Sequence, residues 1–500
     1  MKFLEAVACT AALLPLAVAD WQFKSRTDLA PPRLNITIPA TKDVEKGYLF
    51  IAPFPGQWAE PQFHGPRQEA PYIVRDDGWN GQDVLFSFEG DHNPAYGHGH
   101  GHATILNQRY ETIRELRAGN HKLMDKHEFH VVDEKTALLQ VYQPVPRDLS
   151  RWGGSAEQQW IVDAIFQVEL DLDTGELLFE WSSLEHVSPD EAVLPLNPGQ
   201  AGAGYNSSDA WDYFHINSVD KDAEVHKING TTGEIIWRLG GLRSDFELGP
   251  NVKFCFQHHA RFVEQSDDEE IISLFDNSAH GTENHRGKEV HTHPFSQGKV
   301  ISVNTVTWTA NIVQAFQPPD GLLAKSQGST QLLPNGNALV NWGSEGALTE
   351  FRADGTPIFH AYMDSGLLGE GVQNYRAFRY NWTGLPTEEP AIVAEKTPSG
   401  TKVFVSWNGD TETVVWRFYA VTDGFGSREF LGEATRDGFE TSFSLPGHIY
   451  QRLSAEAVSA RGRVLTTTRV AHIQDAVLPY GSATDGSEDR GSWRQLILQA

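Results

Sequence analysis

Short runs of alternating apolar and polar residues dominate the chain, and most of them meet at a turn built from Asp or Asn with Gly. Clear copies of this pattern lie at residues 170–181 and 228–237, and looser copies lie at 333–340 and 352–360. Strict alternation places one face of a strand in a core and the other in solvent. The pattern therefore predicts an all-β protein made of repeated antiparallel hairpins.

Such hairpins recur over much of residues 20–387, which favours a β-propeller, in which each blade buries its faces against its neighbours. One large β-sandwich, or two, is the alternative, because hairpin spacing alone does not establish that the sheets close into a ring. A Pro/Glu/Thr-rich stretch at 386–390 suggests a domain boundary near residue 388.

Beyond that boundary, short predicted strands separated by turns indicate a small immunoglobulin-like or fibronectin-like sandwich over residues 388–475. Residues 476–500 have weak periodicity and are expected to form a tail.

The first 19 residues read as a secretory signal peptide, with a lysine, an apolar run and a small-x-small pattern at 17–19. An uncleaved anchor is the alternative, although the run is shorter than the ~20 residues of a membrane span. Cleavage would remove Cys9 and leave Cys255 alone, so no intramolecular disulfide is expected. The prediction is a secreted or secretory-pathway lumenal protein. Four N-x-S/T sequons are candidate glycosylation sites: Asn35, Asn206, Asn229 and Asn381.

The net charge of the chain disfavours some classes of binding partner. The formal net charge is −26, from 40 Lys and Arg against 66 Asp and Glu, which disfavours nucleic acid and anionic membrane surfaces. Once the signal peptide is removed, no membrane association is expected. The 27 Phe, 14 Trp and 13 Tyr residues supply enough aromatic surface for large cores and for an aromatic ligand site.

Histidine is the informative residue type, because 16 of the 20 histidines lie between His92 and His293. Imidazole exchanges protons near neutral pH, acts as a nucleophile and binds metals. His98, His100 and His102 alternate at a period of two, which would place them on one face of a strand. We expect no metal there, because no carboxylate-rich or thiolate motif stands beside them. The sequence around His127 also differs from the HExxH zinc signature.

Five motifs, in order, resemble the fungal branch of the arylsulfotransferase-like (ASST) family. They lie at 212–218, 228–241, 256–262, 273–277 and 331–337, and the resemblance covers roughly residues 45–385. It implies a six-bladed propeller with a pocket on the central axis. In bacterial arylsulfotransferases, axial histidines and an arginine carry sulfuryl transfer between phenols through a sulfated histidine.

Carried over by position, the resemblance implies three catalytic residues. His215 matches the first axial histidine, His258 the second, and Arg261 would be a nearby cation. The alternative for both histidines is hydrogen bonding between blades. Residues of the same motifs would bind substrate or fix histidine tautomers: Asn217, Gln257, His259, Asp276 and Asn277.

The chain departs from the family pattern in a later blade, where residues 326–331 contain no histidine and the next one is His360. The first blade is also abbreviated near residues 77–84. Sulfuryl transfer needs a nucleophile and a cationic shell, and the sequence makes neither evident.

The leading functional hypothesis is therefore an enzyme that cyclises a phenolic or tropolone-like substrate, as hetero-Diels–Alder pericyclases resembling this family do in secondary metabolism. That reaction needs a shaped aromatic pocket, a proton donor and proximity. Aryl sulfotransferase and non-catalytic ligand-binding propeller are the alternatives. Each predicts a small aromatic partner and no cofactor.

Overall fold

The structure, a computed structural model, is built almost entirely of β-strands. It describes residues 21–29, 31, 33–55, 79, 81–92, 98–192, 195–197, 202–220, 226–241, 243–280, 290–363, 372–422, 427–475 and 498–499. The expected signal peptide and most of the expected tail lie outside these residues.

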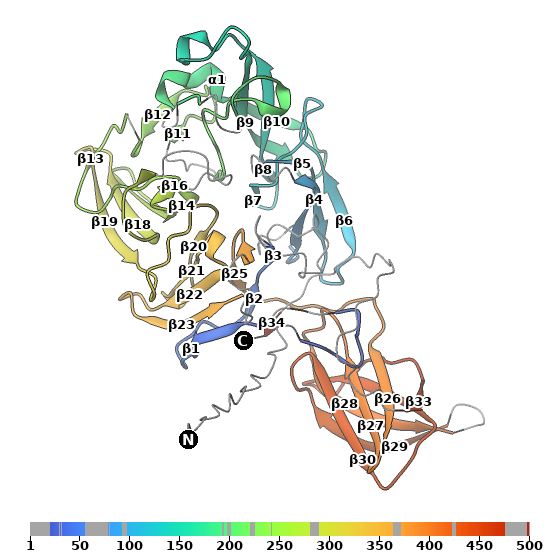
Figure 1. Cartoon of the computed structure of the whole chain (residues 1–500). Coiled ribbons are helices and arrows are strands. Elements are labelled where there is room, and N and C mark those ends of the chain that lie inside the picture. Colours follow the sequence, from blue (N-terminus) through green and yellow to red (C-terminus); the bar gives the residue numbers. More distant parts are fainter. Residues whose placement is uncertain are drawn as a thin grey trace, which may run out of the picture.

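Five sheets follow one another along the first part of the chain and surround a common centre (Figure 1). The first contains β4 (Leu85–His92), β5 (Gly99–Leu106) and β6 (Thr112–Leu116). The second contains β7 (Phe129–Val132), β8 (Thr136–Pro146), β9 (Trp160–Asp171) and β10 (Leu177–Ser182), and α1 (Ser183–His186) follows it. A two-stranded sheet is formed by β11 (His226–Ile228) and β12 (Ile235–Arg238).

The two sheets that follow have five strands each. One contains β13 (Glu247–Leu248), β14 (His258–Gln265), β15 (Glu269–Asp276), β18 (Gln297–Asn304) and β19 (Thr309–Phe316), with the small pair β16 (Ala279–His280) and β17 (Val290–His291) beside it in sequence. The other contains β20 (Ser329–Leu332), β21 (Ala338–Asn341), β22 (Ala347–Phe351) and β23 (Pro357–Tyr362), and takes β1 (Asn35–Ile38) as its outer strand.

Strands from the two ends of this part of the chain pair with each other. The strand β2 (Tyr48–Phe50) lies between β25 (Phe378–Tyr380) and β34 (Leu498–Gln499), and β3 (Pro53–Pro55) pairs with β24 (Val372–Asn374). These pairings join the beginning of the arrangement to its end by backbone hydrogen bonds.

Buried clusters connect successive sheets. Phe86 packs with Leu139 of the second sheet, and Phe275 packs with Trp342 of the last one. Leu85 shares a cluster with Phe50 of β2, which returns the arrangement to the first sheet. The propeller-like arrangement is therefore confirmed, with four blade-like sheets of three to five strands, whereas the count of six blades stays a prediction.

The predicted hairpins are confirmed at β9–β10, β11–β12, β20–β21 and β22–β23. Their turns follow the chemistry expected of Asp and Asn. Asp171 Oδ1 accepts the Thr174 N–H at 2.7 Å, and Asn229 Oδ1 accepts the Thr231 N–H at 2.9 Å. Each side chain thereby replaces a backbone acceptor and stabilises the reversal of the chain.

The C-terminal part differs from the expected sandwich of two sheets. Its strands form one nearly closed, barrel-like sheet, because β33 pairs in parallel with β26 and antiparallel with β31. Trp416 and Phe418 lie in its core. The strands are β26 (Ala391–Thr397), β27 (Gly400–Ser406), β28 (Thr413–Val421), β29 (Arg428–Thr435), β30 (Glu440–Pro446), β31 (Arg452–Ser459), β32 (Val464–Thr467) and β33 (Ala471–Asp475).

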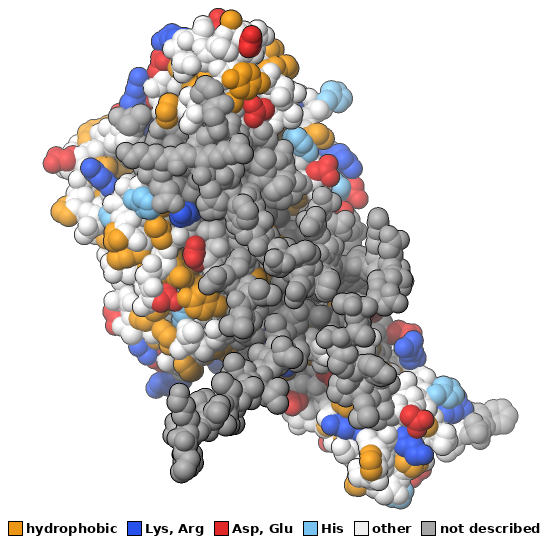
Figure 2. All heavy atoms as spheres, in the orientation of Figure 1, with side chains coloured by type: hydrophobic (Ala, Val, Ile, Leu, Met, Phe, Trp, Pro, Cys, Tyr) orange, Lys and Arg blue, Asp and Glu red, His pale blue; other side chains and the backbone are white. Residues whose placement is uncertain are grey.

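The two parts of the chain are hydrogen-bonded to each other, since the Tyr110 hydroxyl donates to Gly409 O at 2.6 Å. On the face shown in Figure 2, acidic, basic and hydrophobic side chains are interspersed. Among the described residues, no helix has the length and apolarity that a membrane span requires.

Candidate active site at the centre of the propeller

Aromatic rings from six segments of the chain meet where the sheets converge. The His98 ring stacks on Tyr142 with centroids 3.8 Å apart, and the His127 and His215 rings are 5.1 Å apart. Tyr375 lies 5.5 Å from His127 and 6.2 Å from His258, also between ring centroids. Because these residues come from different sheets and the β24–β25 connection, their meeting point is the centre of the arrangement.

Asp125 and His127 form a carboxylate–imidazole pair just before β7. Asp125 Oδ1 accepts a hydrogen bond from His127 Nδ1, and Asp125 Oδ2 accepts the Gly99 N–H at 2.6 Å. His127 Nε2 therefore carries the lone pair, and no described residue forms a hydrogen bond with it. The hydrogen bond at Nδ1 fixes the orientation of the ring, and the lone pair of Nε2 can accept a proton or bind another atom.

Electrostatics keep this pair as a carboxylate and a neutral imidazole. Burial lowers the pKa of His127 to about 4, against the opposing effect of Asp125. Burial alone would raise the pKa of Asp125, but His127 and the Gly99 N–H hold that pKa well below its usual range. At neutral pH the ring of His127 is thus neutral, with a lone pair on Nε2 and a charged partner at Nδ1.

Glu128, the next residue, lies between two arginines. It accepts hydrogen bonds from Arg261 at 2.7 Å and from Arg376 at 3.0 Å. Burial opposes ionisation, yet the two guanidinium groups lower the pKa of Glu128 to about 2. A second carboxylate, Asp220, also acts on the charge of Arg261. Arg376 Nε is buried with no hydrogen-bond partner in the described part of the chain.

Asp212 lies between two histidines. Its Oδ2 is 2.6 Å from His215 Nδ1 and 3.0 Å from His98 Nε2. Burial would raise the pKa of Asp212, but the histidines hold it far below its usual range. His215 has the most open ring of this group, with 37% of its side chain exposed.

Both ring nitrogens of His258 are engaged. Its Nδ1 lies 2.8 Å from Asn277 Oδ1, and Asn277 Nδ2 donates to two backbone carbonyls, so Nδ1 carries the proton. Its Nε2 accepts the Gln327 N–H at 3.2 Å. Burial lowers the pKa of His258 to about 3. The residue joins the start of β14 to the segment before β20, which is the inter-blade role weighed above.

The other residues selected from the sequence lie around this centre. His259 contacts Thr330 O at 3.1 Å and the Phe378 ring, so it lies between sheets. Asn217 Nδ2 donates to Gln257 O at 2.8 Å, while its backbone oxygen accepts from Arg376. Asp276 pairs with Lys299 at 2.7 Å and accepts the Cys255 N–H. These contacts are between protein groups.

Sequence reasoning missed most of the central residues. The segment around His127 was not predicted as a site because it lacks the HExxH zinc motif. The carboxylate two residues before this histidine is a signal in the sequence for a carboxylate–imidazole pair. No local pattern marked Tyr375 and Arg376. The residues it did not select are His98, Asp125, His127, Glu128, Tyr142, Asp212, Tyr375 and Arg376.

The expected single face of three histidines forms only in part, because His100 and His102 are two residues apart within β5 and His98 lies outside the strand. His98 precedes β5 and contacts Asp212, whereas His102 lies 3.9 Å from both Glu89 and Glu115. Among the sequons, Asn35, Asn206 and Asn381 are exposed and Asn229 is half-buried. Glycosylation stays a prediction.

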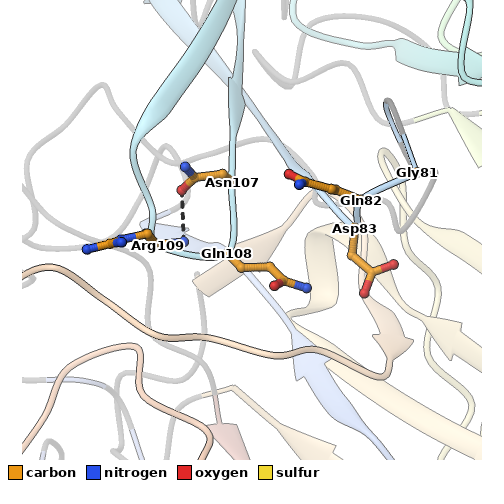
Figure 3. Close-up of a pocket in the computed structure, with 6 residues that line it drawn as sticks. All are labelled: Gly81, Gln82, Asp83, Asn107, Gln108 and Arg109. Atoms are coloured by element: carbon orange, nitrogen blue, oxygen red, sulfur yellow. Dashed lines mark hydrogen bonds between the residues drawn. The ribbon is translucent and has the colours of Figure 1, made fainter. Parts of the chain in front are cut away.

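A separate hollow of about 490 Å³ lies at the edge of the first sheet. Figure 3 shows that its lining is polar, with a hydrogen bond from Arg109 N to Asn107 Oδ1 at 2.8 Å. No histidine lines it. We therefore place the candidate chemistry at the ring cluster and not here.

Comparison with protein families identifies the class. The model described as Arylsulfotransferase (ASST) matches residues 79–364, which is 286 of the 500 residues. The chain belongs to the arylsulfotransferase family. All the central residues named above except Tyr375 and Arg376 lie inside the match.

Other comparisons give distant matches only. No curated protein matches the chain. A crystal structure of a protein of unknown function from Bacteroides caccae is 9% identical, covers 72% of this chain and 83% of its own, and has a TM-score of 0.19. The extracellular domain of BT3049 from B. thetaiotaomicron is 10% identical, with coverages of 87% and 78% and a TM-score of 0.13.

Proposed function

We propose that the protein is an aryl sulfotransferase that uses His127 as its nucleophile. The observation that carries the proposal is the Asp125–His127 pair, in which His127 Nε2 has no hydrogen-bond partner among the described residues. The next residue, Glu128, binds Arg261 and Arg376. Family membership supports the reaction class.

The residues fit a two-step transfer. His127 Nε2 attacks the sulfur of an aryl sulfate, the bond between sulfur and the phenolic oxygen breaks, and a phenolate leaves. A second phenol then attacks the sulfur, the N–S bond breaks, and the phenol's proton passes to the first phenolate or to solvent. Asp125 orients the imidazole and stabilises the charge it acquires.

The two arginines answer the need for a cationic shell. Their guanidinium groups would stabilise the sulfuryl oxygens, which carry more charge in the transition state. The Tyr142 and Tyr375 rings supply aromatic surface for a phenol. The nucleophile sought in a later blade is thereby supplied by the segment before β7. We also propose secretion, based on the N-terminal sequence.

The test is an assay with p-nitrophenyl sulfate and a phenol acceptor. His127→Ala should reduce transfer by at least about 10³-fold, and Asp125→Asn by about 100-fold or more. Rapid quenching without acceptor should trap a peptide containing His127 with one added SO₃ group. His102→Ala is the matched control, since His102 contacts only surface carboxylates among its described ion-pair partners.

The cyclisation hypothesis is tested in parallel with a quinone-methide precursor and a terpene polyene. Enzyme-dependent adduct stereochemistry together with no sulfuryl transfer would replace the sulfotransferase by a pericyclase. Wild-type transfer that survives in His127→Ala would contradict the role of His127. Inactivity in both assays would leave the ligand-binding propeller.

A further inference from the structure

His98, Asp212 and His215 bring three metal-ligating atoms together. His98 Nε2, one Asp212 carboxylate oxygen and His215 Nδ1 all lie within 4.8 Å of one another. Two imidazole nitrogens and one carboxylate oxygen form a donor set that suits divalent transition metals and leaves positions open for water or substrate.

The three side chains are held in place by contacts with the surrounding protein as well as by their hydrogen bonds to one another. The His98 ring lies against Tyr142 with an interplanar angle of 10°, and the following residue, Gly99, is fixed by its hydrogen bond to Asp125. Asp212 and His215 are three residues apart in one segment, where Ile216 is anchored through its backbone to the Tyr142 hydroxyl. One tyrosine of β8 thus positions both sides of the group.

The described hydrogen-bond partners of Asp212 satisfy only one of its two carboxylate oxygens. Asp212 Oδ1 is buried and has no hydrogen-bond partner among the described residues. Both histidines turn a nitrogen to the same oxygen, Oδ2, so Oδ1 is left to a further partner. A buried carboxylate in this state gains most from a cation.

The distances between the ligand atoms show how far the side chains must move to bind a metal ion. In a tetrahedral zinc site the ligands lie at about 2.0–2.2 Å, so neighbouring ligand atoms are roughly 3.3 Å apart. Asp212 Oδ2 is 2.6 Å from His215 Nδ1 and 3.0 Å from His98 Nε2. The ligand atoms must therefore separate by about 0.7 Å in the first pair and about 0.3 Å in the second when the ion binds.

We propose that His98, Asp212 and His215 form a three-ligand site for a divalent transition metal ion of the zinc type. The ring centroid of His127 lies 5.1 Å from that of His215 and 6.4 Å from that of His98, so the group adjoins the Asp125–His127 pair. The site does not depend on the proposed activity, because its geometry rests on other residues.

Metal binding is measured directly on the purified protein, with both the propeller-like and the C-terminal parts present. After treatment with a chelator, Zn²⁺ titration followed by calorimetry should give one tight site, and Co²⁺ should give the visible absorption of a four- or five-coordinate complex. Loss of an outer-shell contact costs about 10–100-fold in metal affinity, so Asp212→Asn and His215→Gln should each exceed that loss. Zn²⁺ should raise the thermal midpoint of the wild type and of neither variant.

His102→Gln is the matched control, a nearby histidine outside the group, and it should keep the wild-type affinity. If Asp212→Asn does not fold, His215→Gln alone decides, because its side chain is partly exposed. The proposal is overturned if the wild type binds no Zn²⁺ at micromolar concentration, or if the ligand variants bind it as tightly as the wild type. Transfer activity is not needed for any of these results.

Discussion

Single residues at the centre owe their chemistry to burial and to one charged neighbour each. His127 is buried, which favours its neutral form, while Asp125 fixes which nitrogen carries the proton. His258 is equally buried but has both nitrogens engaged, so the same side chain is a linker there. Hydrogen-bond partners, more than residue type, separate the candidate nucleophile from a structural histidine.

The dependence of sulfuryl transfer on pH should report the ionisation of His127. Protonation removes the nucleophilic lone pair, and the pKa of this ring is about 4, so kcat/KM should stay level from pH 8 to about 5.5 and fall as the pH drops through about 4. Stopped assays over this range, with activity rechecked after return to pH 7, measure it. A fall centred near pH 6.5 would show that the nucleophile has the pKa of an exposed histidine.

His258→Ala should act on stability. The substitution leaves Asn277 Oδ1 and the Gln327 N–H without their partner in a buried setting, so we expect a loss of about 2–4 kcal/mol in the free energy of unfolding. Urea denaturation measures the loss. A stable variant that has lost all activity would instead give His258 a catalytic role.

At the scale of elements, the first sheet positions the nucleophile's segment. The strands β4 and β5 approach closely because Gly90 lies opposite Gly101, and Gly101 N donates to Met124 O at 2.9 Å, next to Asp125. The glycine-rich run that precedes and begins β5 thus serves close packing and backbone anchoring.

Gly101→Ala should therefore disturb both stability and the site. A Cβ there would lie 2.1 Å from Glu89 O and 2.8 Å from Gly90 Cα, so the strands must separate, at a cost of about 1–3 kcal/mol. Thermal unfolding and the transfer assay should both show losses. Gly230→Ala is the control, because nothing lies within 4 Å of its added Cβ. Equal effects of the two substitutions would argue against close packing as the cause.

For the whole molecule, the buried neutral histidines predict sensitivity to acid. The pKa values of His127 and His258 are about 4 and 3 when folded, against about 6.5 when unfolded. Between these values the unfolded chain binds more protons, so stability falls as the pH decreases.

Taken together, protonation of the two rings should lower the free energy of unfolding by about 4 kcal/mol between pH 7 and pH 5. Urea denaturation at both values measures this cost. In His258→Asn the dependence on pH should be about half as steep, even though the variant is less stable throughout. A pH dependence unchanged by the substitution would contradict the assignment.

The repeated hairpins, the turns at Asp171 and Asn229 and the family were predictable, because each depends on residues close together in sequence. The barrel-like closure of the C-terminal sheet was not, because it depends on β33 pairing with strands on both sides. His215, His258 and Arg261 were found from motifs, but their partners Asp212, Asn277 and Glu128 became identifiable as partners only in the fold.

By itself, the sequence determined that the chain alternates apolar and polar residues, turns at Asp and Gly, concentrates histidine in one region and carries the family's motifs. The tertiary structure decided which histidine has an open nitrogen, which two arginines share Glu128, and which carboxylate lies between His98 and His215. These decisions belong to the fold because the partners lie on different sheets, and local sequence carries no information about which distant side chains will meet at the centre of a ring.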